Sequence, residues 1–387
     1  MGPSLSPQWA ERDVTLSFRA AVLHAPQTPL TVETVTAGPL KRNDVLVRIK
    51  AAGLCHTDLE VIEGGLRYPM PIVLGHEAAG VVEEIGPEAH GVAPNGLKIG
   101  DHVVLSWNPH CGHCFYCDRD LPILCETYLA HGPKAVAFDG ESRLRLEAGG
   151  DLKQLMFLGA FGEYAVVADH QAIVMPRELP FDRACLIGCG VMTGVGAALN
   201  VASIEYGSTA MVIGCGAVGL SAVQGARLAG AGEIIAVDLD DAKLALAEEL
   251  GATARINAGR QDVVAVAKAK TGGRGVDVVL EAAGSPQGFG LSVEAARPGG
   301  EVIWLGKTDV TAEVGFRWGA LMGEKRIRRS SYGGARPARD FPMLARAYLD
   351  GRLKLDQLIT RRIALDDIND GFAALKRGEA IRSVVMF

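Results

Sequence analysis

The chain has 387 residues, of which 48% are hydrophobic and 22% charged, so it exceeds one ordinary hydrophobic core and is too apolar to be disordered. Its formal net charge of −6 disfavours nucleic acid as a partner. Its eight cysteines, with no leader-like segment before them, indicate metal ligands and buried thiols in the reducing cytoplasm.

The predicted elements begin after a polar N-terminal tail, residues 1–18. Between residues 19 and 189, short β-branched runs such as 45–49 and 79–85 are separated by turn residues, which predicts a mainly β, barrel-like domain. Weak periodicity over 118–150 predicts loops within this domain.

Residues 190–331 have a different sequence pattern, in which segments typical of strands and of helices alternate. The alternation predicts a doubly wound parallel sheet of the Rossmann type, so the fold class is α/β with a second, barrel-like domain. From residue 332 to 387 the sequence pattern is again mixed and does not alternate regularly between strand and helix. We expect this segment to rejoin the first domain. The strands are expected at 211–213, 234–238, 276–280 and 302–305, and the helices at 218–228 and 241–250.

Two uncharged stretches, 184–204 and 207–226, approach the length of a membrane span. Both are rich in glycine and alanine, and the second contains a glycine-rich turn. A buried strand, a turn and a packed helix explain the second stretch better than a membrane does, so no membrane partner is expected.

Four cysteines lie close together in the sequence, at Cys111, Cys114, Cys117 and Cys125. Four thiolates on one loop form a closed tetrahedral site, which is the arrangement of a structural zinc ion. An iron–sulfur cluster also uses four cysteines, but its common spacings differ. A nucleic-acid zinc module is expected in a basic surround, whereas acidic residues flank this loop.

Three further residues, Cys55, His76 and Cys189, lie in separate motifs. Two cysteines and one histidine leave a fourth position for water or substrate, which is how catalytic zinc is bound. Taken singly, each residue type is more often structural. Cys185 and Cys215 are assigned to that buried structural class.

The sequence GCGAVG at 214–219 follows an apolar strand and opens a helix, which is typical of a dinucleotide-binding turn. Gly214 permits the tight turn, Gly216 lets the backbone approach a pyrophosphate, and Gly219 allows close helix–strand packing. Asp238 ends the next strand, where it would accept hydrogen bonds from the adenosine ribose and repel a 2′-phosphate. NAD is therefore preferred over NADP, and a glycine-rich turn without a ligand is the alternative.

Together these motifs resemble those of the zinc-dependent medium-chain alcohol dehydrogenases of the long type, which carry a structural zinc lobe. The resemblance runs from about residue 19 to 387 and includes GHEAAG at 75–80, the four-cysteine spacing, GCGVMTG at 188–194 and IRS at 381–383. It implies a GroES-like catalytic domain formed by residues 19–189 and 332–387 and a dinucleotide-binding Rossmann domain formed by residues 190–331. It also implies NAD and two zinc ions as cofactors.

The resemblance assigns roles to single residues. Cys55, His76 and Cys189 would hold the catalytic zinc ion, and Asp58 would orient His76. Thr57 would accept the proton of the alcohol hydroxyl, while hydride passes from a zinc-bound alkoxide to NAD.

The resemblance further places Glu77 beside the metal, either in a catalytic role or in a buried pair with an arginine. The implied cofactor contacts are Gly214, Gly216, Val218, Gly219, Asp238, Lys243, His56, Thr193 and Arg382. For Lys243, His56 and Arg382, an ordinary surface charge is the alternative.

Trp107 and Phe157 match family positions near the substrate cleft, where Leu66 is a further apolar residue. Core packing is the alternative for both aromatic residues. If they line the cleft, the resemblance implies reversible oxidation of primary, hydrophobic or aromatic alcohols to aldehydes.

The chain departs from the family pattern in two places. Many relatives have a histidine five residues after the first zinc cysteine, as part of a proton relay, where this chain has Glu60. The glutathione-dependent formaldehyde dehydrogenases, which are the alternative function, use acidic residues at the positions of Leu66 and Tyr68 and an arginine at that of Leu129. Without these charges the tripeptide should bind poorly.

Two other interpretations are open. A zinc-free quinone or enoyl reductase shares the fold but lacks the ligand set, and a non-catalytic NAD-binding protein would have no use for Thr57 and an open zinc site. Similar proteins are homodimers or tetramers joined through their nucleotide domains. We expect a cytoplasmic homodimer, with a tetramer as the alternative, that acts on a small-molecule alcohol or aldehyde.

Overall fold

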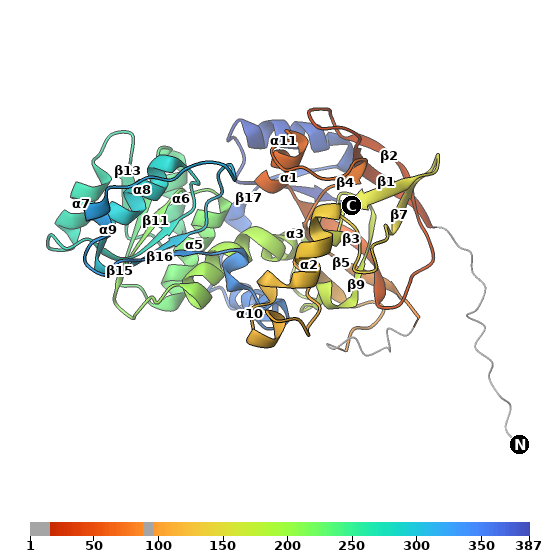
Figure 1. Ribbon diagram of the computed structural model, residues 1–387, viewed down its shortest axis with the longest axis horizontal. Coiled ribbons are helices and arrows are strands. Elements are labelled where there is room, and N and C mark those ends of the chain that lie inside the picture. Colours follow the sequence, from red (N-terminus) through yellow and green to blue (C-terminus); the bar gives the residue numbers. More distant parts are fainter. Residues whose placement is uncertain (1–15, 88–95) are drawn as a thin grey trace, which may run out of the picture.

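The structure is a computed structural model of the chain and describes residues 16–87 and 96–387. Figure 1 shows two lobes side by side along the long axis, with the C-terminal segment (blue) returning to the lobe that holds the N-terminal strands (red). Most of the expected tail, residues 1–18, lies outside the described residues, and strand β1 (Leu16–Leu23) covers the rest.

The lobe with the N-terminal strands is mainly β. Besides β1, its strands are β2 (Thr31–Ala37), β3 (Asp44–Gly53), β4 (Ile72–Val73), β5 (Glu77–Ile85), β6 (His102–Leu105), β7 (Leu144–Leu146), β8 (Asp151–Gln154), β9 (Tyr164–Ala168), β10 (Ala172–Val174), β17 (Ile359–Ile363) and β18 (Arg382–Met386). Its helices are α1 (His56–Ile62), α2 (Glu126–His131), α3 (Phe181–Leu186), α10 (Pro337–Leu349) and α11 (Ile368–Lys376).

These strands form a closed barrel and an adjoining sheet. The barrel runs in the order β1-β2-β7-β8-β4, and the sheet runs β10-β6-β5-β3-β18-β17, with β9 also paired to β3. Along β3 the buried Val47 and Ile49 flank the exposed Arg48, because successive side chains of a strand point to opposite faces. The C-terminal strand β18 pairs with β3, so the last residues complete the sheet of the first ones.

One expectation for this lobe is wrong. The segment 118–150, expected to form loops, also contains the short helix α2 and the strand β7. Strand β7 pairs with β2, where Leu146 lies opposite Val35, and Leu144 is fully buried. Three residues are too few for an alternating pattern to be recognised, so the distant partner strand determines this element.

The second lobe is built on a parallel sheet with helices packed around it (Figure 1). Its strands are β11 (Thr209–Ile213), β12 (Glu233–Asp238), β13 (Ala254–Asn257), β14 (Val276–Glu281), β15 (Ala296–Trp304) and β16 (Arg326–Arg329). Its helices are α5 (Ala217–Ala229), α6 (Asp241–Leu250), α7 (Val263–Lys270), α8 (Pro286–Ala295) and α9 (Trp318–Leu321).

The strands of this sheet lie in the order β13-β12-β11-β14-β15-β16. The chain first adds strands on one side of β11 and then, from β14 on, adds them on the other side, so the strand order reverses between β11 and β14. All of its neighbouring strands are parallel, and β11 carries an apolar run that is buried on both faces. The predicted doubly wound α/β class with a barrel-like second lobe is thus confirmed. Ligands of such sheets bind at the carboxyl ends of the strands, beside the point of reversal.

A helical run joins the two lobes. It consists of α3, a π-helical turn (Ile187–Val191), α4 (Met192–Gly196) and a second π-helical turn (Ala197–Val201). Within the described residues, this run is the one helix whose length and composition would allow it to cross a membrane, yet 72% of its most apolar window is buried inside the protein. It is a core helix, and it crosses the expected domain boundary after residue 189.

A buried carboxyl group lies at the end of β14, next to the point of reversal. The Glu281 side chain is fully buried, and its Oε1 accepts hydrogen bonds from the backbone N–H groups of Ala283 (3.0 Å) and Gly284 (2.9 Å). Within residues 16–87 and 96–387, its Oε2 has no hydrogen-bond partner. Burial raises the pKa of Glu281 to about 7, although the two N–H groups act in the opposite direction.

Glu281 is expected to make the stability of the protein depend on pH. Between the ordinary pKa of 4.5 and the raised value of about 7, the folded protein holds a proton that the unfolded chain releases. The free energy of unfolding therefore falls as the pH rises through this window. Glu281→Gln should remove this contribution, as measured by denaturant unfolding at about pH 5 and about pH 8. A variant with an unchanged pH slope would contradict the assignment.

Candidate metal and nucleotide site

Two cysteines, one histidine and one glutamate from separate parts of the chain meet at one point. Cys55 immediately precedes α1, His76 immediately precedes β5, Glu77 begins β5, and Cys189 lies in the first π-helical turn. The ligand atoms of these four residues all lie within 4.8 Å of one another. The structure therefore brings together the three residues that the sequence analysis expects to bind catalytic zinc.

The hydrogen bonds of His76 leave one ring nitrogen available to a metal ion. His76 is 1% exposed, and its Nδ1 lies 3.2 Å from Asp58 Oδ1, whereas its Nε2 has no hydrogen-bond partner among the described residues. The buried Asp58 also accepts hydrogen bonds from the backbone N–H groups of Cys55 (3.3 Å) and Gly75 (2.9 Å). A carboxylate on one ring nitrogen fixes the tautomer, so the other nitrogen presents its lone pair. These donors fit a zinc ion.

Glu77 forms a buried ion pair with Arg382 beside this site. Nη2 of Arg382 lies 3.1 Å from Glu77 Oε1 and 3.8 Å from Cys55 Sγ. A Cβ on Gly53 would lie 2.5 Å from Glu77 Oε2, and one on Gly190 would lie 2.7 Å from Arg382 Nη2, so a side chain at either glycine would displace the pair. Of the two roles expected for Glu77, the structure contains the ion pair. A contact of Arg382 with a pyrophosphate stays a prediction.

Helix α1 carries the residues expected to handle the proton. Thr57 in its first turn is half-buried, and His56 is exposed. Glu60 lies one turn after His56 on the same face, and its Oε2 lies 2.9 Å from Nζ of Lys307. Because Lys307 follows β15, the carboxylate at the expected relay position is paired with the nucleotide lobe.

The four cysteines of the lobe loop form a second cluster. Two 3₁₀ turns (Cys117–Arg119 and Pro122–Leu124) fold this loop back, and Cys125 immediately precedes α2. Four sulfur donors saturate a tetrahedral ion, so the cluster fits a closed structural zinc site. The ligand atoms of Cys111, Cys114, Cys117 and Cys125 all lie within 4.8 Å of one another.

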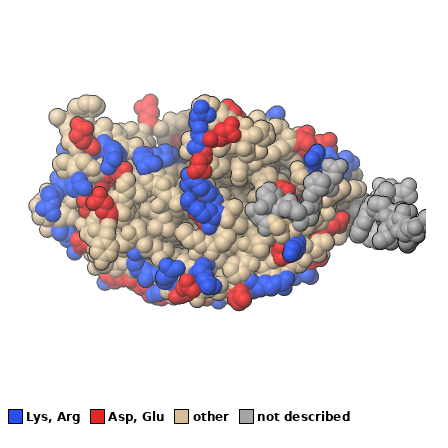
Figure 2. All heavy atoms as spheres, turned by 90° about the horizontal axis from the view of Figure 1, so that it is seen from below, with Lys and Arg blue, Asp and Glu red and all other residues tan. Residues whose placement is uncertain are grey.

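Charges of both signs surround this loop. Asp120 forms an ion pair with Arg336, and the guanidinium of Arg119 lies 3.6 Å from the ring centroid of Phe115. Figure 2 shows basic and acidic side chains interspersed on the face seen from below. A nucleic-acid module would be expected in a basic stripe, so this surround favours a structural role for the cluster.

Cys114→Ser is expected to remove the structural zinc ion and to destabilise the protein. Three thiolates hold zinc less well than four, and the free energy of metal binding is part of the free energy of folding. The zinc content should fall by about one ion per chain and the melting temperature by about 5 °C or more, as measured by elemental analysis and calorimetry. Cys185→Ser is the control, because Cys185 is buried outside both clusters. An unchanged zinc content in Cys114→Ser would contradict the assignment.

The glycine-rich turn between β11 and α5 has the geometry of a phosphate site. Gly214 has a φ of 90°, and a Cβ on Gly219 would lie 1.7 Å from Gly214 O. Gly216 is exposed, faces open space, and begins α5 with no side-chain cap. The free N–H groups of the first turn suit a pyrophosphate. The other expected contacts lie in α5, α4 and α6 and stay predictions: Val218, Thr193 and Lys243.

Asp238 connects this turn with the end of β12. Its Oδ2 accepts a hydrogen bond from the backbone N–H of Cys215 at 2.7 Å, and its Oδ1 accepts from Leu239 (2.7 Å) and Asp240 (3.0 Å). The carboxylate thereby orders the nucleotide loops, and its remaining lone pairs can accept the hydroxyl groups of a ribose.

Asp238→Asn is expected to weaken the preference for NAD over NADP. The amide keeps one oxygen for the backbone N–H groups but has lost the charge that repels a 2′-phosphate. The ratio of kcat/KM for NAD to that for NADP should fall by about 10-fold to 100-fold. Steady-state kinetics with both nucleotides measures this ratio. A ratio equal to that of the wild type would show that Asp238 does not face the ribose.

Of the residues expected at the substrate cleft, Trp107 lies near the metal site. It is half-buried and stacks on Tyr332 with a centroid distance of 4.3 Å. The hydroxyl of Tyr332 donates a hydrogen bond to the carbonyl of Gly188, the residue before Cys189. Leu66 is half-buried and packs against the barrel core.

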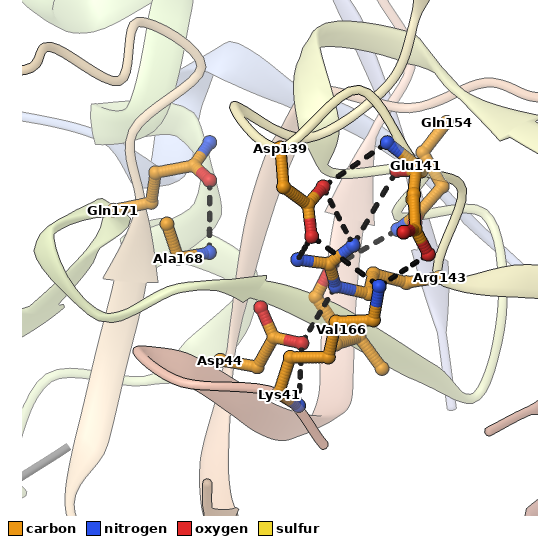
Figure 3. Close-up of polar contacts among 9 residues, drawn as sticks. All are labelled: Lys41, Asp44, Asp139, Glu141, Arg143, Gln154, Val166, Ala168 and Gln171. Carbon is orange, nitrogen blue, oxygen red and sulfur yellow. Dashed lines mark hydrogen bonds and ion pairs between the residues drawn. The ribbon is translucent and has the colours of Figure 1, made fainter. Parts of the chain in front are cut away.

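Phe157 lies in the wall of a cavity of about 370 Å³ whose lining does not include the metal-site residues. It is buried with a φ of 62°, and its ring packs edge-on against Tyr128 and Phe138. Figure 3 shows the polar side of this cavity, where Lys41, Asp44, Asp139, Glu141 and Arg143 form an ion-pair network. A contact of Phe157 with substrate stays a prediction.

Sequence reasoning missed two tyrosines near the site. Tyr332 is 2% exposed and reaches Gly188 through its hydroxyl, a contact between distant segments that no spacing pattern indicates. Tyr68 is half-buried, and burial together with the negative charge of Asp58 raises its pKa. The sequence had marked Tyr68 only as a position that lacks a charge.

The arrangement defines a zinc- and nicotinamide-dependent oxidoreductase, and comparisons with known proteins agree. The alcohol dehydrogenase GroES-like domain matches residues 41–177, and the zinc-binding dehydrogenase family matches residues 217–349. The S-(hydroxymethyl)glutathione dehydrogenase of Paracoccus denitrificans is 37% identical over 379 residues, which cover 95% of this chain and 99% of that protein.

Solved structures give the same result. An alcohol dehydrogenase zinc-binding domain protein from Burkholderia ambifaria matches with a TM-score of 0.92 and 36% identity, covering 97% of this chain and all of that one. The benzyl alcohol dehydrogenase of Acinetobacter calcoaceticus matches with a TM-score of 0.90 and 31% identity, and the match covers 96% of this chain and 99% of that one. The chain belongs to the zinc-dependent medium-chain alcohol dehydrogenase family, which confirms the resemblance and the expected cofactors, zinc and NAD.

Proposed function

We propose that the protein oxidises primary, hydrophobic or aromatic alcohols to aldehydes with NAD, and catalyses the reverse reaction. The observation that carries the proposal is the aromatic stack beside the metal site. The half-buried Trp107 lies on the buried Tyr332, which contacts the residue before Cys189, so an apolar indole ring adjoins the proposed reaction centre. An aromatic ring of a substrate can pack on such a surface.

The positions that hold glutathione in the rival branch support the same choice. Leu66 and Tyr68 replace acidic residues there, and Leu129 replaces an arginine. Leu129 is 56% exposed on α2, so this surface offers an apolar side chain where the tripeptide would need a cation. A ligand with several charges would lose its partners at these positions.

In the proposed mechanism, bound zinc supplies a Lewis acid and NAD a hydride acceptor. Oγ1 of Thr57 would accept the proton of the alcohol hydroxyl through a hydrogen bond and at the same time pass on its own hydroxyl proton. Asp58 keeps His76 in the orientation that exposes Nε2. Trp107 packs against the substrate and excludes water from the reacting carbon. The proton then leaves along α1, where Glu60 lies one turn beyond His56.

A single assay tests the proposal. Purified protein is mixed with NAD and benzyl alcohol in the absence of thiols, and NADH absorbance is followed. We expect turnover that is lost on zinc chelation, with kcat/KM about tenfold or more above that for ethanol. Absence of turnover in the zinc-loaded protein would overturn the proposal.

A second candidate is a thiol-dependent formaldehyde dehydrogenase. It is favoured by the name of the relative from Paracoccus denitrificans, which is an S-(hydroxymethyl)glutathione dehydrogenase. The same assay with formaldehyde, with and without glutathione, distinguishes the two. NADH formation that requires glutathione, together with poor oxidation of benzyl alcohol, would establish this second function instead.

A further inference from the structure

The backbone that carries Cys189 is irregular and buried. Residues 187–191 form a π-helical turn between α3 and α4. A widened turn interrupts the regular hydrogen bonds of an α-helix, and a buried carbonyl group needs a partner from elsewhere. Gly188 is packed directly on β6, because a Cβ there would lie 2.9 Å from Leu105 O. Gly188 is itself buried, so its carbonyl lies away from water.

Tyr332 supplies the partner of this carbonyl. Its hydroxyl donates a hydrogen bond to Gly188 O and lies 3.5 Å from Ser106 Oγ. The side chain is 2% exposed, and burial raises the pKa of the phenol well above its usual range. Burial thus favours the protonated phenol, which can donate a hydrogen bond.

The backbone of Tyr332 is held in an unusual conformation. Tyr332, Gly333 and Gly334 have φ values of 55°, 65° and 60°, in the left-handed region that disfavours a tyrosine. The turn is fixed against the joining helix, since a Cβ on Gly333 would lie 2.4 Å from Met192 O. Asn200 Nδ2 also donates to Gly333 O at 3.2 Å. The phenol is thus aimed at Gly188 by a rigid turn.

The ring of Tyr332 contacts a second functional element. It stacks on Trp107 with an interplanar angle of 34°, and Phe341 packs edge-on against it. Nε1 of Trp107 is buried without a hydrogen-bond partner in the part of the chain that the structure describes, so ring packing orients the indole there. The Tyr332 side chain therefore contacts Trp107 with its ring and, with its hydroxyl, the segment that carries Cys189.

We propose that Tyr332 is a positioning residue for both halves of the active site. Its hydroxyl holds the backbone next to Cys189 in the geometry that metal binding requires, and its ring holds Trp107 in the substrate cleft. The part that concerns substrate rests on the proposed function, whereas the part that concerns the metal does not.

Tyr332→Phe tests the first half, because phenylalanine keeps the ring and removes only the hydroxyl. The variant should lose its catalytic zinc to a chelator about 10-fold to 100-fold faster than the wild type, as outer-shell partners of metal ligands do when removed. In protein reconstituted with Co²⁺, the thiolate-to-metal absorption band should shift. KM for benzyl alcohol should stay within about threefold, because the ring that supports Trp107 remains.

Two controls separate positioning from general stability. Tyr348→Phe also removes a tyrosine hydroxyl, one that lies 3.4 Å from Asp356 away from the metal, and should leave the cobalt spectrum unchanged. Trp107→Leu should leave that spectrum unchanged but raise KM for benzyl alcohol relative to that for a straight-chain alcohol. The lobe zinc should be retained in all three variants.

The outcomes are distinct. Normal zinc retention and an unshifted cobalt band in Tyr332→Phe would overturn the proposal, whatever the change in melting temperature. A Tyr332→Phe chain that does not fold would also overturn it, because the hydroxyl would then be needed for folding. If no alcohol is oxidised by any variant, the proposed function fails, while the metal measurements still decide the role of the hydroxyl.

Discussion

His76→Ala is expected to slow NAD reduction strongly and to lower the zinc content by about one ion per chain. The substitution removes the unpartnered Nε2 from the metal cluster and leaves the buried Asp58 carboxylate without its imidazole. Loss of outer-shell partners costs a metal site about 10-fold to 100-fold, so loss of a ligand should lower turnover by about 100-fold or more. Elemental analysis and the NADH assay measure the two effects.

Two further variants serve as comparisons for His76→Ala. His24→Ala, at an exposed histidine paired with Glu33, should change neither quantity. The turnover and zinc content of Asp58→Asn should lie between those of His24→Ala and His76→Ala, because the amide keeps the size of the side chain but orients His76 less strongly. If His76→Ala kept its full zinc content, the proposed ligand set would be incorrect.

Gly219→Ala is expected to destabilise the fold, whereas Gly216→Ala is expected to weaken the binding of NAD. At Gly219 the new Cβ would lie 1.7 Å from Gly214 O, so the turn must open, at a cost of about 3 kcal/mol or more in folding free energy. At Gly216 the new Cβ meets nothing within 4 Å, so the fold should be unaffected. The methyl group would instead occupy the space into which a pyrophosphate must come, and the Kd for NAD should rise by about tenfold or more.

Calorimetry and nucleotide titration on both variants test this pair. The expected pattern is a lower melting temperature for Gly219→Ala and a normal one, with weakened NAD binding, for Gly216→Ala. Gly315→Ala is a matched control, because a Cβ there also meets nothing within 4 Å and Gly315 lies outside the glycine-rich turn. Unimpaired NAD binding by Gly216→Ala would place the pyrophosphate elsewhere.

The sequence was most informative where chemistry demands a local pattern. Four cysteines on one loop and the GCGAVG turn are recognisable because ligand spacing and backbone conformation are properties of neighbouring residues. The parallel sheet was also predictable, since β11 and β12 are continuous apolar runs separated by a helix. The short strand β7 was not, because only its pairing with β2 defines it.

Contacts between distant segments had to come from the fold. Helical spacing places Glu60 on one face with His56, but nothing in the sequence indicates that Lys307, 247 residues later, pairs with it. The hydroxyl of Tyr332 is likewise directed to Gly188 by a turn whose conformation depends on the helix against which it packs. The roles of single residues toward zinc, NAD and substrate therefore remain predictions, whereas the family and the fold are confirmed.

The ion pair between Glu77 and Arg382 has a consequence for biosynthesis. The two residues are 305 positions apart, and a ribosome that adds about 5–20 residues per second needs about 15–60 s to reach the second after the first. Until then Glu77 lacks its arginine partner, and β3 lacks its neighbour β18. The ion pair beside the metal ligands can therefore form only after Arg382 has been added, long after Cys189, the last of the three expected zinc ligands, has been synthesised.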